Sequence, residues 1–486
     1  MKRVALILAG GKGTRLWPLS REKFPKFFLK FEKDKSLIQE SFLRLKGFFD
    51  VKDIFIASGG EYRYLIKQEI ERLGFKYPLE NILPEPVSRN TCSAITLGAF
   101  YFKNRFKDAI MSVFPADHII KPYSVFHKAL EKANSCALRD FLVTLGIKPD
   151  YPATGYGYIK AKVARLKAKN KKAKVASPPD RRAGLKAKKY YEVERFIEKP
   201  DIKKAKRFLK EGGYYWNAGI FVFKVSKILS EIEKFMPEIY NKFQKWNGKD
   251  FTYLEKIYTD LPDISIDYAV MEKSKDIALV PFSGIWSDVG CFEEFYKILK
   301  KDKSGNVISG RVLNIDSKNS FLLSDEERQL VTLGVNNLVV INTKDATLVM
   351  KNGEGQKVKK VFEILKNDIV TKEHKLVIKP WGWYKVLEDK PGYKVKILGV
   401  NPGERLSLQK HKYRDENWIV IKGEAIVTLD KKNIRLKEGE SVNIPRGVLH
   451  RVYNPDRKRI LEILELSRGE VIIEEDIIRL EDKYER

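Results

Sequence analysis

The 486-residue sequence is poor in cysteine, with Cys92, Cys136 and Cys291 far apart along the chain. An odd, scattered set of three excludes a disulfide framework and is typical of the reducing cytoplasm. No apolar run approaches 18 residues, which excludes a membrane-spanning helix and argues against a membrane partner. The short apolar stretch 4–9 passes directly into glycines without a cleavage pattern, so it predicts a buried first strand rather than a signal peptide. We therefore expect a cytoplasmic, globular protein.

Acidic residues are scarce relative to basic ones, and the formal net charge is +29. The stretch 161–189 alone holds 12 Lys or Arg against one acid, Asp180. It lacks an apolar face, so we interpret it as a solvated insertion loop; an anion-binding arm is the sharper alternative. Elsewhere no basic stripe is interleaved with aromatic residues and no nucleic-acid-binding motif occurs, so we expect no nucleic-acid partner.

The first 300 residues alternate short apolar strands with amphipathic helices. Strands are predicted at 4–9, 53–57 and 109–114, and helices at 64–73 and 124–138. This alternation predicts an α/β layered sheet with mainly parallel strands.

The rest of the chain is predominantly β. Short strands are predicted at 321–323, 338–342 and 347–350, and we interpret 301–370 as a β-rich connector without a catalytic cluster. From 371 to 486 the alternation is strong, with strands predicted at 393–399, 418–429, 440–445 and 460–466, which is typical of a small all-β barrel or sandwich. We thus expect three domains, 1–300, 301–370 and 371–486.

A glycine-rich turn follows the first predicted strand. Gly10, Gly11 and Gly13 would let the backbone approach a phosphate and offer N–H donors, while Lys12, Arg15 and later Lys26 add positive charge. The turn is not a P-loop, because GxxxxGK[ST] is absent. It is not a Rossmann fingerprint either, because the third glycine of GxGxxG is missing. Such turns are common, so this one alone is weak evidence.

A wider set of motifs is similar to the signature of sugar nucleotidyltransferases, specifically mannose-1-phosphate guanylyltransferases. Eight segments occur in order: Leu8-Ala9-Gly10-Gly11-x-Gly13-Thr14-Arg15-Leu16-Trp17-Pro18-Leu19-Ser20-Arg21 with Pro25-Lys26, Glu85-Pro86-x-x-Arg89-Asn90-Thr91, Pro115-Ala116-Asp117-His118, Thr154-Gly155-Tyr156-Gly157-Tyr158-Ile159, Phe196-x-Glu198-Lys199-Pro200, Trp216-Asn217-Ala218-Gly219-Ile220-Phe221, Ser265-Ile266-Asp267-Tyr268 and Trp286-Ser287-Asp288-Val289-Gly290.

The resemblance implies an α/β nucleotidyltransferase domain with a Rossmann-like mixed sheet of the GT-A-like kind. It implies that the phosphate of mannose 1-phosphate attacks the α-phosphorus of GTP and that pyrophosphate leaves. Such catalysis depends on positioning and charge neutralisation, and Mg²⁺ prefers one or two carboxylates together with phosphates.

The resemblance also assigns residues to this reaction. Asp117 and Asp288 would hold Mg²⁺, and Arg15 and Lys26 would stabilise the leaving pyrophosphate, so Arg15, Lys26 and Asp117 are the expected catalytic residues. The nucleotide would lie against Leu8, Gly10, Gly11, Gly13, Thr14, Glu85, Arg89 and Asp117. The sugar phosphate would bind Gly155, Glu198, Lys199 and Asn217. His118 could be a ligand, although we favour a neighbour of Asp117. Phe27 stands where the family usually has Gln.

The chain has only five histidines, and two of them, His411 and His450, lie in the last domain within segments that match a metal-binding pattern. Gly403-x5-Gln409-x-His411-x4-Glu416-x6-Gly423 and Gly439-x5-Pro445-x-Gly447-x2-His450-x3-Asn454 are similar to both halves of the cupin metal motif, with Gln in place of the first His. Two residues apart on a strand, Gln409 and His411 share a face. With Glu416 and His450 they form a ligand set that suits Zn²⁺ or another divalent metal, with a position open for substrate.

Further segments resemble the isomerase half of a fused family, the bifunctional mannose-6-phosphate isomerases and mannose-1-phosphate guanylyltransferases (type II isomerases). They are Lys379-Pro380-Trp381-Gly382, Pro402-Gly403-x-x-Leu406-Ser407-Leu408-Gln409, Arg414-x-Glu416 and Ile444-Pro445-x-Gly447-x-x-His450-Arg451. The resemblance implies an all-β cupin barrel that interconverts mannose 6-phosphate and fructose 6-phosphate. The metal would polarise the carbonyl while a base, which the sequence does not identify, moves a proton between C1 and C2.

Arg414, expected to be catalytic, and Arg451 are candidates for stabilising the substrate phosphate or an enediolate. The family commonly continues Arg-x-Glu with His-Trp, whereas this chain has Asn417-Trp418, preceded by Lys412 and Tyr413. If the missing imidazole handles the proton, isomerase activity would be weak or lost. The alternative is therefore a guanylyltransferase whose cupin is a structural or sugar-binding module. A homo-oligomer is left open.

Overall fold

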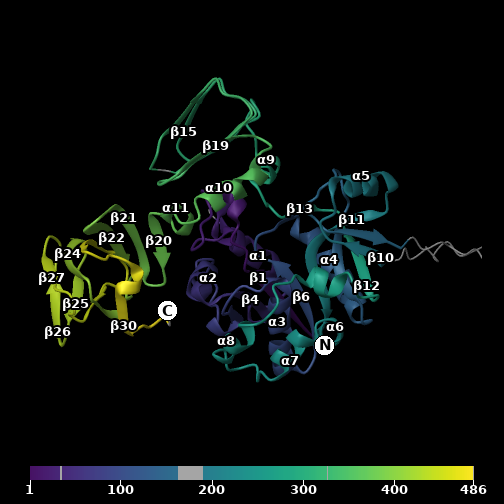
Figure 1. The fold of residues 1–486 in the computed structure, drawn as a ribbon, viewed down its shortest axis with the longest axis horizontal. Helices are drawn as coiled ribbons and strands as arrows, with labels where there is room; N and C mark the ends of the chain where they lie inside the picture. Colours follow the sequence, from purple (N-terminus) through teal and green to yellow (C-terminus); the bar gives the residue numbers. More distant parts are fainter. Residues whose placement is uncertain (33–34, 163–189, 326, 485–486) are drawn as a thin grey trace, which may run out of the picture. The chain divides into compact units, whose positions relative to one another are not determined.

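A computed structural model describes residues 1–32, 35–162, 190–325 and 327–484 (Figure 1). Nearly all of the basic stretch expected to form an insertion loop, 163–189, lies outside the described residues. By its internal contacts the chain divides into two compact units. The first contains Met1–Gly11, Phe27–Arg63 and Glu69–Gly290, and the second contains Lys12–Lys26, Tyr64–Gln68 and Cys291–Arg486.

The first unit is built on a nine-stranded sheet. Its order is β5 (Ile82–Glu85), β4 (Ile54–Gly59), β1 (Lys2–Ala9), β6 (Ala109–Pro115), β11 (Tyr214–Lys224), β8 (Leu142–Ile147), β12 (Ile277–Phe282), β10 (Tyr191–Ile197) and β9 (Tyr158–Ala161). The strands predicted at 4–9, 53–57 and 109–114 are confirmed as β1, β4 and β6. These strands and β5 are parallel to one another.

The expectation of a mainly parallel sheet is wrong, whereas the mixed sheet implied by the family resemblance is correct. The long strand β11 runs antiparallel to β6, β8 and β9, and β10 runs antiparallel to β12 and β9. Hydrophobic periodicity reports burial and not strand direction, so it could not reveal this reversal.

Helices cover the sheet: α1 (Leu37–Lys46), α3 (Asn90–Phe106), α4 (Tyr123–Ala137), α5 (Ile202–Glu211), α6 (Val225–Phe235), α7 (Pro237–Gln244) and α8 (Tyr253–Tyr258). The predicted helices at 64–73 and 124–138 correspond to α2 (Arg63–Glu71) and α4. Ser36 and Gln39 start α1 with a reciprocal capping box. The short strands β2 (Lys30–Glu32) and β3 (Lys35–Ser36) form one ribbon, and β7 (Ile119–Lys121) and β13 (Ile285–Ser287) form another.

From Cys291 on, the second unit continues with α9 (Phe292–Ile298) and a β coil whose strands pair in parallel, except β19, which is antiparallel to β18. Its strands are β14 (Val307–Ser309), β15 (Val312–Ile315), β16 (Phe321–Ser324), β17 (Leu330–Leu333), β18 (Leu338–Asn342) and β19 (Thr347–Lys351). The pairs Val312↔Leu330 and Phe321↔Val339 show the repeat of the coil. The strands predicted at 321–323, 338–342 and 347–350 are confirmed, but helices α10 (Val358–Ile364) and α11 (Ile369–Lys372) were not predicted.

Two sheets form the C-terminal barrel. One has the order β20 (Leu376–Lys379), β21 (Gly382–Lys390), β22 (Tyr393–Val400), β29 (Leu461–Gly469), β24 (Arg414–Lys422) and β27 (Ser441–Ile444). The other has β26 (Lys432–Leu436), β25 (Ala425–Leu429), β28 (His450–Tyr453), β23 (Leu408–His411) and β30 (Ile477–Glu481). The segment 418–429 is two strands rather than one, because Gly423 turns the chain with φ of 91°.

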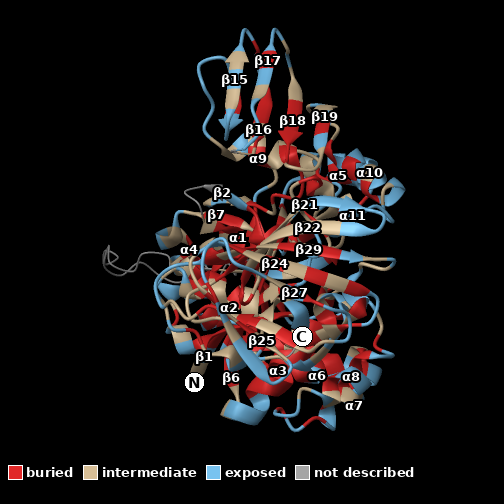
Figure 2. Cartoon of the chain, turned by 90° about the vertical axis from the view of Figure 1, so that its left-hand side faces the viewer, coloured by how far each residue is buried: buried red, intermediate tan, exposed pale blue. Residues whose placement is uncertain are grey.

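Buried residues alternate along β24 and β29, as Figure 2 shows, so one face of each strand points into the barrel. The core of the barrel contains the fully buried Trp418. Among the described helices of the whole chain, none is long and apolar enough to cross a membrane.

Candidate active sites

The glycine-rich turn leaves space beside its backbone. A Cβ atom placed on Gly10 or Gly11, just after Leu8 and the end of β1, would meet no heavy atom within 4 Å, and the same holds for Gly155. Open space beside a glycine backbone suits close approach of a phosphate or sugar. Gly13, immediately before Thr14, is different: its φ is 69°, and a Cβ there would lie 2.5 Å from Cβ of the buried Lys26. Only glycine fits at position 13, and its contact fixes the stem of Lys26.

The two aspartates expected to hold Mg²⁺ lie at the same end of one short antiparallel ribbon. Asp117 and His118 precede β7, Asp288 follows β13, and Ile119 pairs with Ser287 in that ribbon. Tyr156 donates a hydrogen bond to Asp288 Oδ1 at 3.0 Å. His118 lies edge-on to Trp286, with Nε2 3.9 Å from Asp117 Oδ1.

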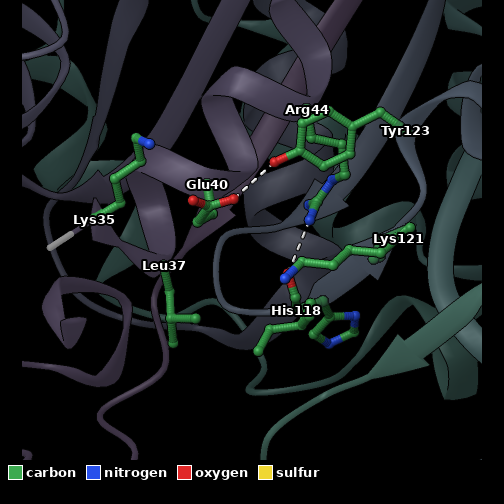
Figure 3. A pocket seen from close by; sticks show the side chains of 9 residues that line it. Lys35, Leu37, Glu40, Arg44, His118, Lys121 and Tyr123 are labelled. Carbon is green, nitrogen blue, oxygen red and sulfur yellow. Dashed lines mark hydrogen bonds between the residues drawn. The ribbon is translucent and has the colours of Figure 1, made fainter. Parts of the chain in front are cut away.

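Helix α1 holds the turn that carries Asp117. Ser41 donates to the carbonyl of Ala116 at 2.9 Å, and Arg44 donates to the carbonyl of His118 at 2.8 Å. Figure 3 shows Arg44 reaching the His118 backbone at the side of a small pocket, where Tyr123 also donates to Glu40 at 2.7 Å. Burial lowers the pKa of Arg44 to about 10, so it stays charged at neutral pH. The helix thus fixes the backbone on both sides of Asp117.

Three of the expected sugar-phosphate residues lie with a fourth that was not predicted. Asn217 accepts a hydrogen bond from Thr144 at 2.8 Å and donates to Asp267 at 2.9 Å. Burial, and then the charge of Glu198, raise the pKa of Asp267 to about 7. Lys199 Nζ lies 3.1 Å from Glu198 Oε1. Asp267 belongs to a signature segment, Ser265–Tyr268, and that was the available signal for it.

Gly157 packs directly against this group. A Cβ on Gly157 would clash with Glu198 Oε2 and lie 3.4 Å from Cβ of Asn217. Glycine at this position therefore makes room for the Glu198 carboxylate.

Glu85 and Arg89, expected in the nucleotide pocket, are both tied to the end of α8. Tyr258 donates to Glu85 at 3.2 Å, and Arg89 donates to the carbonyls of Tyr258 and Thr259 at 3.2 and 2.7 Å. Burial raises the pKa of Glu85 to about 7, against the opposing hydrogen bond from Tyr258. These contacts fix the position of the two side chains.

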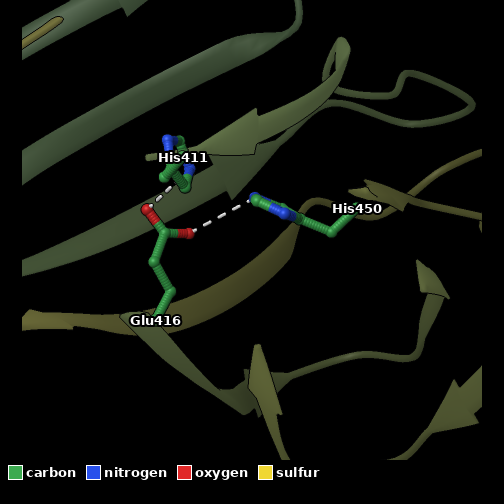
Figure 4. A group of neighbouring side chains, drawn as sticks. All are labelled: His411, Glu416 and His450. Atoms are coloured by element: carbon green, nitrogen blue, oxygen red, sulfur yellow. Dashed lines mark ion pairs between the residues drawn. The ribbon is translucent and has the colours of Figure 1, made fainter. Parts of the chain in front are cut away.

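The barrel brings two imidazoles and a carboxylate together in its interior (Figure 4). Candidate ligand atoms of His411, Glu416 and His450 all lie within 4.8 Å of one another, and all three residues are buried. His411 Nε2 is 3.1 Å from one Glu416 oxygen, and His450 Nε2 is 3.6 Å from the other. This cluster could hold a metal ion.

The hydrogen bonds of the cluster fit a metal. His450 Nδ1 lies 2.9 Å from the carbonyl of Val448, which fixes the tautomer and leaves Nε2 as a buried atom without a hydrogen-bond partner. Burial lowers the pKa of His450, which favours the neutral, metal-binding ring. Burial alone would raise the pKa of Glu416, but the hydrogen bond from His411 and the charge of Arg414 hold it well below its ordinary value.

Gln409, the fourth expected ligand, lies on β23 opposite His450 in the register of β28. Its Oε1 accepts a hydrogen bond from Ser407 at 2.9 Å. That contact orients the amide, and the register places it beside the histidine cluster.

Arg414 is buried and held against the cluster. Its Nε donates to Glu416 at 2.9 Å, and its Nη1 donates to the carbonyl of Ile473 at 3.0 Å. Arg451 follows His450 on β28, so its side chain lies on the opposite face, where it pairs with Glu481 at 3.0 Å. Of the two arginines, Arg414 is the one that contacts the cluster of His411, Glu416 and His450.

Asn417 does not face the interior of the barrel. Along β24 the side chains of Arg414, Glu416 and Trp418 are buried while Asp415 and Asn417 are less so. Successive residues of a strand point to opposite faces, so position 417 is turned away from Glu416. Asparagine in place of the family's histidine therefore leaves the inner face of the barrel unchanged.

A buried ion pair on the same sheet was missed. Lys396 of β22 lies 3.1 Å from Glu465 of β29, whose oxygen also accepts from Ser467 at 3.1 Å. Burial alone would lower the pKa of Lys396, but the charges of Glu465 and Glu416 raise it, so the side chain remains a cation. Two glutamates, Glu462 and Glu465, interrupt the apolar segment Ile460–Leu466. Glu465 shares its strand face with Leu461 and Ile463, and this alternation was the available signal, because unpaired charges are rarely buried.

Three family models match consecutive parts of the chain. The model described as nucleotidyl transferase matches residues 4–305. The MannoseP isomerase/GMP-like beta-helix domain matches residues 310–365, and the mannose-6-phosphate isomerase C-terminal model matches residues 366–482.

Full-length relatives exist among curated proteins. A mannose-1-phosphate guanylyltransferase of Klebsiella pneumoniae is 40% identical over 489 residues and covers 99% of each chain. The xanthan biosynthesis protein XanB of Xanthomonas campestris is 39% identical and covers 99% of this chain and 98% of its own. A crystal structure titled as a mannose-1-phosphate geranyltransferase of Thermus thermophilus is 28% identical, with a TM-score of 0.63 over 75% of this chain and all of that one.

Proposed function

Because the chain belongs to the mannose-1-phosphate guanylyltransferase family, with an isomerase-type C-terminal domain, we propose that it makes GDP-mannose from GTP and mannose 1-phosphate. The observation that carries this proposal is the near-complete alignment with curated guanylyltransferases at 40% identity. The open backbone at Gly10, Gly11 and Gly155 supports it, since a nucleotide and a sugar phosphate need such surfaces.

In the proposed reaction an oxygen of mannose 1-phosphate bonds to the α-phosphorus of GTP, and the α–β bridging bond breaks to release pyrophosphate. Asp117 and Asp288 would hold Mg²⁺, which supplies charge neutralisation at the phosphates. Arg15 and Lys26 stabilise the negative charge that develops on the leaving group. Glu198, Asn217 and Asp267 orient the sugar through its hydroxyls.

We also propose that the barrel is a metal-dependent isomerase of mannose 6-phosphate and fructose 6-phosphate. The cluster of His411, Glu416 and His450 carries this proposal, with Gln409 as a fourth ligand. Two imidazoles and two oxygen donors suit Zn²⁺, which when bound polarises a carbonyl. Arg414 orients Glu416 and offers positive charge to an enediolate.

The outward position of Asn417 favours this activity over the alternative of a barrel without turnover. The alternative arose because a histidine is missing at 417, yet the strand directs that side chain away from Glu416. We propose a cytoplasmic enzyme on the basis of its phosphorylated substrates and its three buried free cysteines.

The decisive experiment assays both reactions on one zinc-loaded preparation. We expect fructose 6-phosphate to give mannose 6-phosphate, and GTP with mannose 1-phosphate and Mg²⁺ to give GDP-mannose. His450→Ala should abolish only the isomerase, whereas Asp117→Asn should abolish only the transferase. Transferase without isomerase in the wild-type protein would make the barrel a binding or structural module. Absence of GDP-mannose would refute the main proposal.

A further inference from the structure

Several hydrogen bonds join the signature segment Lys12–Lys26 to a stretch of the same unit that is distant in the sequence, residues 370–374. Glu22 and Lys23 donate from their backbone nitrogens to the carbonyls of Thr371 and Lys372, both at 2.9 Å. Trp17 Nε1 donates to the carbonyl of Val370 at 2.9 Å. These bonds dock the segment along helix α11, so its conformation depends on residues more than 340 positions away.

A buried ion pair fixes the middle of the same segment. Arg21 donates to Asp345 Oδ1 at 2.9 Å, and their side chains are 0% and 6% exposed. Thr343 donates to the same oxygen at 2.8 Å, and Arg21 also donates to the carbonyls of Pro18 and Ser20. Removing one partner of a buried pair leaves an uncompensated charge, so this contact resists rearrangement.

The arginine expected to act on the leaving group is held from the same side. Arg15 Nη1 donates to Gln356 Oε1 at 3.0 Å, and Gln356 lies in the turn before α10. Both side chains reach solvent, and Gln356 has no charge, so the bond directs the guanidinium without neutralising it. The amide of Gln356 therefore orients the guanidinium of Arg15 and leaves its positive charge available to a phosphate.

We propose that Gln356 and Asp345 are positioning residues for guanylyl transfer: Gln356 aims Arg15, and Asp345 fixes the segment that carries it. The inference rests on the proposed guanylyltransferase activity and extends it to residues outside the nucleotidyltransferase match at 4–305. Neither residue touches substrate; each acts through the signature segment.

The test is steady-state kinetics of GDP-mannose formation by full-length Gln356→Ala. We expect kcat to fall about three- to tenfold, while KM for GTP changes less than twofold and Tm is unchanged, because a charge-assisted hydrogen bond that orients a catalytic group is lost. Gln356→Glu keeps the acceptor oxygen but adds a negative charge beside Arg15, so we expect its kcat to stay at least threefold below that of the wild type. Gln329→Ala is the matched control, because Gln329 is also exposed and accepts from Arg311 at 3.0 Å within the same coil.

A kcat of Gln356→Ala equal to that of the wild type, or an equal loss in Gln329→Ala, would overturn the role of Gln356. Asp345→Asn should lower kcat about tenfold or more while the far-ultraviolet circular dichroism stays that of the wild type, and an unchanged kcat would overturn its role. A wild-type chain that forms no GDP-mannose would overturn the proposed function and this inference with it.

Discussion

At the scale of single residues, Gly157 shows how an absent side chain shapes a site. A Cβ at this position would push against the end of Glu198, a flexible group, and not against backbone. Gly157→Ala should therefore displace Glu198 at little cost in stability. We expect KM for mannose 1-phosphate to rise about tenfold and Tm to change by less than about 2 °C. Gly60→Ala is the control, because its new methyl would meet only Pro84 at 3.9 Å; equal KM values for the two variants would refute the role of Gly157.

Asp267 predicts a pH dependence of stability. Its pKa is raised to about 7 in the folded chain, above the ordinary value of 3.8, by burial and by Glu198. Between about pH 4 and pH 7 the native protein holds a proton that the unfolded chain releases, so this group makes stability fall as the pH rises through that window.

Asp267→Asn mimics the protonated carboxyl and should remove the contribution of this group to the fall of stability with rising pH. We expect the loss of Tm between pH 5 and pH 8, followed by calorimetry, to be smaller by about 2–4 °C than in the wild type. Asp263→Asn changes an exposed carboxylate of the loop that precedes the helical turn Asp267–Met271 and should leave the pH profile unaltered. The same profile in Asp267→Asn and the wild type would contradict the assignment.

At the scale of the element, strand β24 separates two neighbouring residues by the alternation of its faces. Asn417→His adds an imidazole on the outer face, and we expect the isomerase rate to change less than twofold. Glu416→Gln alters the inner face and should lower bound zinc and isomerase rate together, by about tenfold or more. Metal analysis measures the bound zinc, and the fructose 6-phosphate assay measures the isomerase rate. A large increase of that rate in Asn417→His would show that position 417 takes part in proton transfer.

Elements with a local cause were predictable from the sequence. Strand β1, helix α4 and the barrel strands follow from hydrophobic periodicity, and the histidine motifs predicted His411 and His450 on neighbouring strands, which are β23 and β28. The reversal at β11 and the partner of Arg21 could not be predicted, because they depend on contacts between residues far apart in the sequence, such as Trp216 with Ile147 and Arg21 with Asp345. Lys396 and Glu465 were missed for the same reason: each looks like an ordinary surface charge until the strands pair.

At the scale of the whole molecule, the two proposed reactions differ in how their metals are held. The barrel cluster is buried and includes two imidazoles, whereas Asp117 and Asp288, the carboxylates expected to hold Mg²⁺, are only half-buried. Treatment with dipicolinate should abolish the isomerase, and transferase activity should stay within twofold when Mg²⁺ is resupplied. Zinc should then restore the isomerase. Loss of both activities after treatment, with zinc and not Mg²⁺ restoring the transferase, would contradict separate metal sites.

The pairing of Arg21 with Asp345 has a consequence for biosynthesis. The two residues are 324 positions apart, so the partner of the signature segment leaves the ribosome long after the segment itself. At about 5–20 residues per second, the nascent chain waits roughly 16–65 s before Asp345 is available to pair with Arg21. A nascent or prematurely terminated chain would thus contain the signature segment without the contacts that fix its conformation. Nucleotide turnover would begin only after most of the polypeptide has been made.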